Sequence, residues 1–169
     1  ARLPFAGMLA LTLIATWYGV YYLARSPAAQ PVAFAFGGEA QPTDYARAMA
    51  DGGLLALLAC LGLAQLSHEA TSYLVQLCCT TLVFFGFAAL GFHTVAPALA
   101  LAAGLAGLTL AGAPALAAML GLGGAWLVWR SASVDIAHQR RWVTATLILV
   151  AAVALMAWQL DLWRWRLVG

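Results

Sequence analysis

The chain has 169 residues, of which 64% are hydrophobic and only 8% are charged. Soluble domains carry about 25% charged residues, so the composition excludes an ordinary soluble domain. It predicts an all-α, multi-pass integral membrane protein, because the bilayer accepts apolar surface that water does not. The net charge of +2 is too small to favour a nucleic-acid partner.

Six apolar segments are candidate membrane spans, and together they form a single transmembrane domain over residues 1–169. They cover about residues 4–24, 43–66, 70–92, 94–111, 115–129 and 142–160. The first is interpreted as a spanning helix and not as a signal peptide, because no convincing cleavage site follows it. The fourth and fifth are short, and they are compatible with two short helices or with one helix and a re-entrant piece. Five spans is therefore the alternative count.

The second span is predicted to begin at Thr43, a candidate N-cap, with Asp44 in the first turn where the helix dipole favours an anion. A polar segment, Arg130 to Arg141, is predicted to separate the last two spans. Arginine placement favours an N-terminus on the outside. The inside loops would then hold Arg25, Arg47, Arg130, Arg140 and Arg141, against Arg2, Arg164 and Arg166 outside.

Three charged residues form the main polar constellation near the apolar segments: Asp44, Arg47 and Asp51. Their spacing of three and then four residues puts them on one face of a helix. Asp51 is predicted to lie deeper in the membrane, where an unpaired carboxylate costs roughly 2–3 kcal/mol, and Arg47 is its expected partner. The constellation fits a proton or ion relay, or a salt-bridged helix entry that only sets the register.

His68, Glu69 and His93 are the candidate ligands for a metal or a chlorophyll-type pigment. His68 and Glu69 are adjacent, so they do not face one site on a helix, and no second histidine follows His68 by three or four residues. This spacing argues against a zinc or haem site. The alternative interpretation is that the histidines are structural or solvated groups near the membrane surface.

Small residues at intervals of four predict close helix packing, within the chain or with a partner. They are Ala103, Gly107 and Ala111 in the fourth span, and Ala117 and Gly121 in the fifth. The pair Gly52-Gly53, directly after Asp51, permits either close approach of another helix or local unwinding. Cys60, Cys78 and Cys79 form no CxxC motif and are interpreted as small buried hydrophobes.

Several residues around the second span follow a known pattern: Phe36-Gly37-Gly38-Glu39, Pro42, Ala46-Arg47 and Asp51, with Tyr22 upstream. Over about residues 15–66 the chain thereby resembles the bacteriorhodopsin group of microbial rhodopsins. The resemblance implies a β-hairpin between the first two helices of this chain. It also makes Arg47 the match of the arginine that lies near the family's counter-ion aspartate.

The chain departs from that family at several points. Asp51 follows Arg47 by four residues instead of three, which turns the side chain by about 100°. The family's first helix is missing, and so are the tryptophan, paired threonines and proline that follow its aspartate. Since the chain has no lysine, it cannot bind retinal covalently. The resemblance leaves open a degenerate, opsin-like relative.

No phosphate-binding loop, serine elbow, HExxH or kinase element is present, so the chain is not expected to be an enzyme of a familiar class. The favoured function is a non-catalytic subunit of a larger membrane complex, in contact with membrane lipids and other membrane proteins. This function includes the binding, by the subunit, of lipid or of a chlorophyll- or carotenoid-type pigment. The alternative is a small proton, ion or solute transporter that uses Arg47 and Asp51.

Overall fold

A computed structural model describes residues 3–31, 40–60, 72–131 and 136–162, and the regular structure in these ranges is helical. This confirms the predicted all-α class. The elements are α1 (Leu3–Arg25), a 3-10 turn η1 (Pro27–Ala29), α2 (Pro42–Cys60), α4 (Ser72–Ala89), α5 (Val95–Leu110), α6 (Pro114–Arg130) and α7 (Ile136–Gln159).

Proline and glycine mark most of the helix boundaries. Helix α1 ends two residues before Pro27, because the residue before a proline is pushed out of the helical region. Pro42 and Pro114 occupy the first positions of α2 and α6, where a missing N–H has no consequence. Gly112, with φ of 82°, makes the tight turn between α5 and α6.

Two details predicted for the helix starts are wrong, although the second helix begins within one residue of Thr43. Gln41 and not Thr43 precedes the second helix, since its carbonyl accepts the backbone N–H groups of Asp44 and Tyr45. The last helix begins at Ile136 and not at Trp142, so much of the predicted polar separator forms its first turns. Histidine, glutamine and arginine are acceptable in a helix, so the polar residues before Trp142 extend α7.

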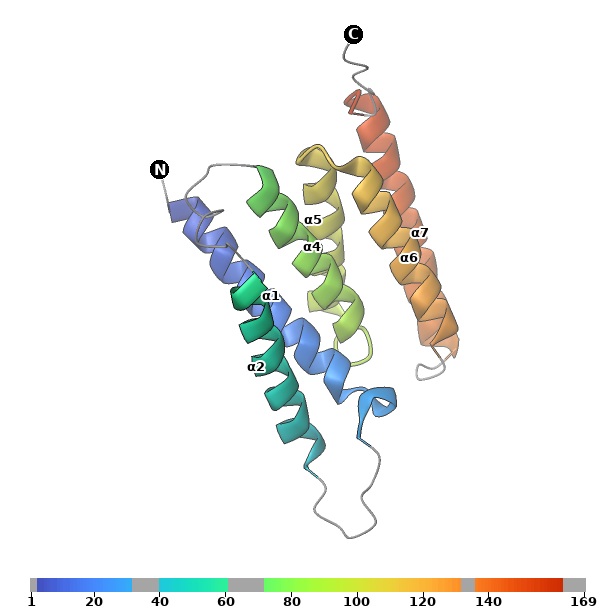
Figure 1. Cartoon of the computed structure of the whole chain (residues 1–169). Coiled ribbons are helices and arrows are strands. Elements are labelled where there is room, and N and C mark those ends of the chain that lie inside the picture. Colours follow the sequence, from blue (N-terminus) through green and yellow to red (C-terminus); the bar gives the residue numbers. More distant parts are fainter. Residues whose placement is uncertain (1–2, 32–39, 61–71, 132–135, 163–169) are drawn as a thin grey trace.

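The helices run alternately up and down (Figure 1). Helix α4 is central and packs against α1 on one side and α5 on the other. Helix α2 packs on α1, whereas α6 and α7 pair with each other and contact α5. The end of the bundle where α1 and α6 end and α2 and α7 begin carries Arg25, Arg47, Arg130, Arg140 and Arg141, and it is called the arginine-rich end below.

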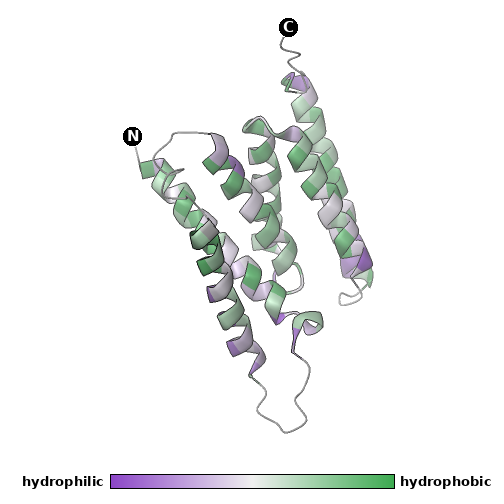
Figure 2. Cartoon of the chain, viewed as in Figure 1, coloured by the Kyte–Doolittle hydropathy of each residue, from purple (hydrophilic) through white to green (hydrophobic). Residues whose placement is uncertain are grey.

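Three of the described helices are long and apolar enough to cross a membrane: α1, α4 and α7. Helix α2 falls short of that standard because it carries three charges within 19 residues. Helices α5 and α6 are apolar but have only 16 and 17 residues, about 24–26 Å of helix against a hydrocarbon core of about 30 Å. Figure 2 shows hydrophilic residues at the arginine-rich ends of α2 and α7 and mainly apolar ones along α4 and α5.

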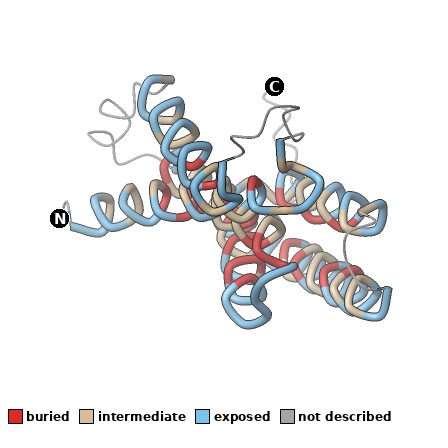
Figure 3. Tube along the Cα trace, turned by 90° about the horizontal axis from the view of Figure 1, so that it is seen from below, coloured by how far each residue is buried: buried red, intermediate tan, exposed pale blue. Residues whose placement is uncertain are grey.

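The core cluster is formed by residues of α4, α5, α6 and α7, and Figure 3 shows that buried residues gather toward the middle of the bundle. Leu105 and Leu108 of α5 are fully buried there, against Cys79 and Val83 of α4. Glycines allow this closeness: a Cβ on Gly104 would lie 2.8 Å from the Cys79 carbonyl oxygen. By contrast, only 17% of the apolar stretches of α1 and α7 is buried within the chain, so most of their surface faces outward.

Candidate functional site

Asp51 is bound to α1 by a hydrogen bond from a tryptophan. The indole Nε1–H of Trp17 donates to Asp51 Oδ1 over 2.8 Å, and the Asp51 side chain remains exposed on the outside of the α1–α2 pair. Trp17 lies eight residues before the end of α1, so the bond is about 12 Å from the level of Arg25. A carboxylate therefore stands on the bundle surface well away from the helix ends.

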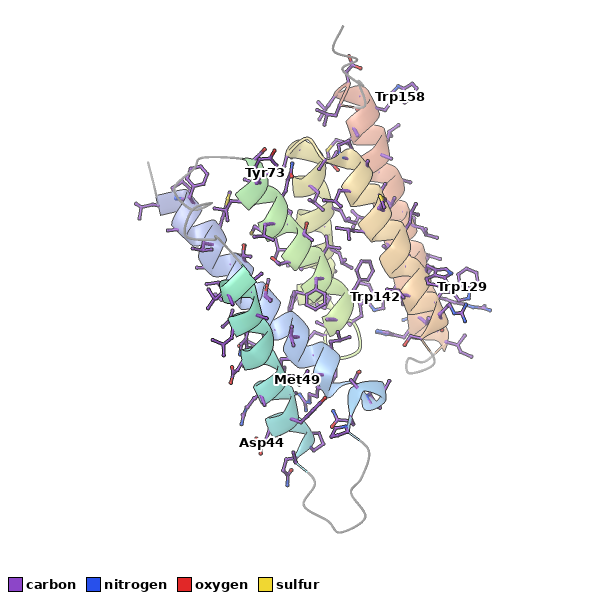
Figure 4. The ribbon with its side chains drawn as sticks, viewed as in Figure 1. Asp44, Met49, Tyr73, Trp129, Trp142 and Trp158 are labelled. Atoms are coloured by element: carbon purple, nitrogen blue, oxygen red, sulfur yellow. The ribbon has the colours of Figure 1, made fainter. Side chains whose placement is uncertain are left out.

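Arg47 does not form the expected ion pair with Asp51. Its guanidinium lies 3.4 Å from Asp44 Oδ1, and both side chains are largely exposed, at 65% and 63%. The pair occupies the first turns of α2, where Asp44 points away from the bundle (Figure 4). An exposed pair of this kind stabilises by only about 0–1 kcal/mol. The predicted Arg47–Asp51 contact is thus replaced by two separate contacts, one at the helix entry and one across the helix pair.

An aromatic cluster surrounds the arginine-rich end of α1. Trp17 stacks on Tyr21 with ring centroids 5.4 Å apart, and Tyr22 contacts Phe92 at 5.1 Å. The Arg25 guanidinium lies over Phe92, 5.5 Å from the ring centre. Tyrosine rings and a cation near the level of Arg25 are typical of a membrane–water interface, whereas Trp17 lies about 12 Å from that level.

His93 belongs to this cluster. Its Nε2 lies 2.9 Å from the Tyr22 hydroxyl, which joins the end of α1 to the turn between α4 and α5. His93 is thus bound to a tyrosine at the arginine-rich end, whereas the other two predicted ligands, His68 and Glu69, lie outside the described residues. Within the described ranges, no group of three or more His, Cys, Asp or Glu side chains lies close enough to hold a metal ion.

His138, which falls in the segment predicted to separate the last two spans, lies in the first turns of α7. Its Nε2 is 3.1 Å from the Leu90 carbonyl oxygen and 2.8 Å from Nε1 of Trp142. A single neutral tautomer satisfies one of these contacts: Nε2 donates to Leu90 when protonated, and accepts from Trp142 when not. The contact with Leu90 joins α7 to the turn after α4, whereas the contact with Trp142 lies within α7.

The small-residue predictions meet different outcomes. Ala117 and Gly121 are buried, and the stripe continues to Ala125. In α5, Gly107 packs against Sγ of Cys79, but Ala103 is exposed and Ala111 is partly exposed. The closely packed face of α5 instead passes through two residues that the interval of four from Ala103 missed, Ala100 and Gly104.

The pair after Asp51 is helical and not unwound. Gly53 faces Val20 of α1, with a hypothetical Cβ 3.0 Å from Val20 Cγ2, whereas a Cβ on Gly52 would meet nothing within 4 Å. Gly53 therefore serves the close approach of α1 and α2. Cys78 and Cys79 are free and buried, while the side chain of Cys60 lies outside the described residues.

Sequence reasoning missed the partners of Asp51, His93 and His138. All three are aromatic side chains, Trp17, Tyr22 and Trp142, and spacing along a single helix does not identify the first two. The available signal is depth: Trp17 is eight residues before the end of α1 and Asp51 nine after the start of α2. In two antiparallel helices joined by one connection, such residues reach similar levels.

The predicted β-hairpin lies at residues 32–39, outside the described residues, and the opsin-like resemblance stays a prediction. No family model, curated protein or solved structure matches the chain. The chemistry of the site is therefore carried by its own geometry: an exposed carboxylate between α1 and α2, and an aromatic, basic end below it.

Proposed function

We propose that the chain is a multi-pass integral membrane protein, that its helices cross the bilayer alternately, and that it acts as a non-catalytic subunit of a larger membrane complex. The apolar, outward-facing surfaces of α1, α4 and α7 support the membrane location, since they suit contact with lipid tails. The shorter α5 and α6 lie beside these longer helices. Because α5 and α6 are shorter than the hydrocarbon core is thick, we expect the bilayer to be locally thinner around them.

The single observation that carries the subunit role is the exposure of Asp51. In a bundle that crosses the membrane, this carboxylate would face hydrocarbon, where a charged side chain costs about 2.5–3.5 kcal/mol. The Trp17 bond uses one carboxylate oxygen, and a carboxylate offers about four acceptor positions. Another chain that covers this surface with a donor or a cation would remove the cost.

The surface around Asp51 suits a helix of a partner protein. Leu55 and Leu58 follow Asp51 at intervals of four and seven on the same side of α2, and both are exposed, at 66% and 45%. Exposed leucines beside one acidic group favour a partner helix that is apolar with one arginine, lysine or amide at the matching depth. The transporter alternative loses its intended pair, because Arg47 is engaged with Asp44.

The test is the size of the complex extracted from the native membrane in mild detergent. Asp51→Asn is compared with Asp44→Asn, which makes the same change on the same helix in the exposed entry pair. We expect the D51N variant to yield a smaller particle that lacks at least one companion chain, and the D44N variant to match the wild type. Intact assembly in both variants, with proton or ion flux in liposomes lost only in D51N, would instead establish the transporter.

A further inference from the structure

A groove of about 520 Å³ lies on the outside of the α6–α7 pair near the arginine-rich end. Its walls include Trp129 of α6 and Ile136, Arg140, Val143, Thr144 and Leu147 of α7. The α7 residues recur at intervals of three and four, so they form one stripe along the helix. The groove therefore runs parallel to α7, from the helix start toward the middle of the bundle.

The polarity of the groove changes along its length. Arg140 lies in the second turn of α7, while Leu147 lies seven residues further on, about 10 Å deeper. Trp129 stands at the outer edge with 70% of its surface exposed (Figure 4). The basic group thus sits at the mouth, and apolar side chains line the deeper part, which is the order of groups in a phospholipid.

Beside the groove, Gln139 of α7 binds the last turn of α6. Its amide donates to the Val128 carbonyl over 2.6 Å, and also contacts the carbonyl of Trp129. These are among the last carbonyls of α6, and the Val128 carbonyl also accepts the backbone N–H of Ser131 at the helix C-cap. Because Gln139 binds α7 to the end of α6, the two walls of the groove keep a fixed separation.

The basic charge at the mouth lacks a counter-ion within the part of the chain that the structure describes. Neither Arg140 nor Arg141 forms an ion pair there, and the Arg130 guanidinium lies over the Trp126 ring at 5.4 Å. The sequence from 130 to 141 contains three arginines and one aspartate, Asp135, which lies outside the described residues. Charge complementarity therefore favours an anionic occupant.

We infer that this groove binds an anionic phospholipid, with the phosphate at Arg140 and one acyl chain along Val143 and Leu147. Basic pockets between transmembrane helices on the side that carries the arginines are suited to such headgroups. The inference rests on the proposed membrane location of α7, but it does not need the proposed partner at Asp51. Purified chain without companions is therefore sufficient to test it.

The experiment is native mass spectrometry of the purified chain in mild detergent, titrated with phosphatidylglycerol or with phosphatidylcholine of the same acyl chains. We expect the wild type to bind phosphatidylglycerol about fivefold or more tightly than phosphatidylcholine. Arg140→Gln should remove this preference. Arg141→Gln, which removes the same charge from the adjacent residue outside the groove lining, should retain it.

Two further arms separate a lipid site from a general attraction of charge. Leu147→Trp, which fills the deeper part, should weaken binding of both lipids while the helical signal in circular dichroism is unchanged. Inorganic phosphate should fail to displace bound phosphatidylglycerol at millimolar concentration. Equal loss in R140Q and R141Q, full displacement by phosphate, or unchanged binding in L147W would each overturn the inference.

Discussion

The two outer helix pairs place their polar groups at different depths. In the α1–α2 pair, Asp51 stands about 12 Å from the arginine-rich end and is bonded across the helices by Trp17. In the α6–α7 pair, polar groups such as Gln139 and Arg140 lie in the first turns of α7, and small residues such as Gly121 make the rest of the contact. In the membrane location that we propose, water and lipid headgroups would hydrate the polar groups of the second pair, whereas Asp51 of the first pair would require a group from another protein.

The largest expected effect comes from the close contact of α6 and α7. A Cβ on Gly121 would overlap the side chain of Val150, so Gly121→Ala should lower the free energy of unfolding by about 2 kcal/mol through overpacking. Denaturant unfolding in detergent micelles measures it. Gly123→Ala on the same helix is the control, since its Cβ would meet nothing within 4 Å and alanine favours helix by about 0.5–1 kcal/mol.

The α1–α2 pair should respond less to the same change. Gly53→Ala brings a Cβ to 3.0 Å from Val20, a tighter approach than usual but one that a small shift relieves. The free energy of unfolding should therefore fall by much less in G53A than in G121A. If G53A proves the more destabilising of the two, close packing and not the hydrogen bond would be what holds α1 to α2.

The hydrogen bond itself is tested next. Trp17→Phe removes the indole donor and should cost about 1.5 kcal/mol in the free energy of unfolding, because the acceptor is a carboxylate. In the double variant with Asp51→Asn, the two losses should not add, and the cycle should give a coupling of about 1 kcal/mol. Trp126→Phe, an exposed tryptophan of α6, is the matched control. Additive losses in the double variant would contradict the contact.

The smallest expected effect is at the aromatic cluster. Tyr22→Phe removes the bond to His93 at an exposed site, and should cost about 0.5–1 kcal/mol by the same unfolding measurement. Tyr18→Phe alters a neighbouring ring of the cluster and should be close to neutral, since no described residue hydrogen-bonds to its hydroxyl. Equal losses in the two variants would show that ring packing, and not the histidine contact, stabilises this end.

The helical class and the approximate position of each helix were predictable, because apolar runs bounded by proline and glycine leave few alternatives. Pro114 and Gly112, for example, separate α5 from α6 as two helices. The start of α7 was not predictable from hydropathy, since the charged residues before Trp142 continue the helix instead of ending it. Local composition does not distinguish a polar loop from a polar first turn.

The candidate site was predictable only in part. The identity of Asp51 as the unusual residue follows from its charge inside an apolar helix. Its partner could not be predicted in this way, because spacing along α2 favours Arg47. In the structure the partner is Trp17 of α1, which is 34 residues from Asp51 in the sequence. The small-residue stripe of α6 was readable at intervals of four, but that of α5 was offset by one residue, which rotates the face by about 100°.

The measurement that tests the central claim most directly is site-specific photocrosslinking from Leu55, one turn beyond Asp51, in the native membrane. A photoreactive residue at Leu122 of α6, which is also exposed, is the matched position. We expect position 55 to link to one defined companion chain, and this product to disappear when Asp51→Asn is added. A crosslink pattern that is the same at both positions, or that D51N leaves unchanged, would contradict the claim that another chain covers Asp51.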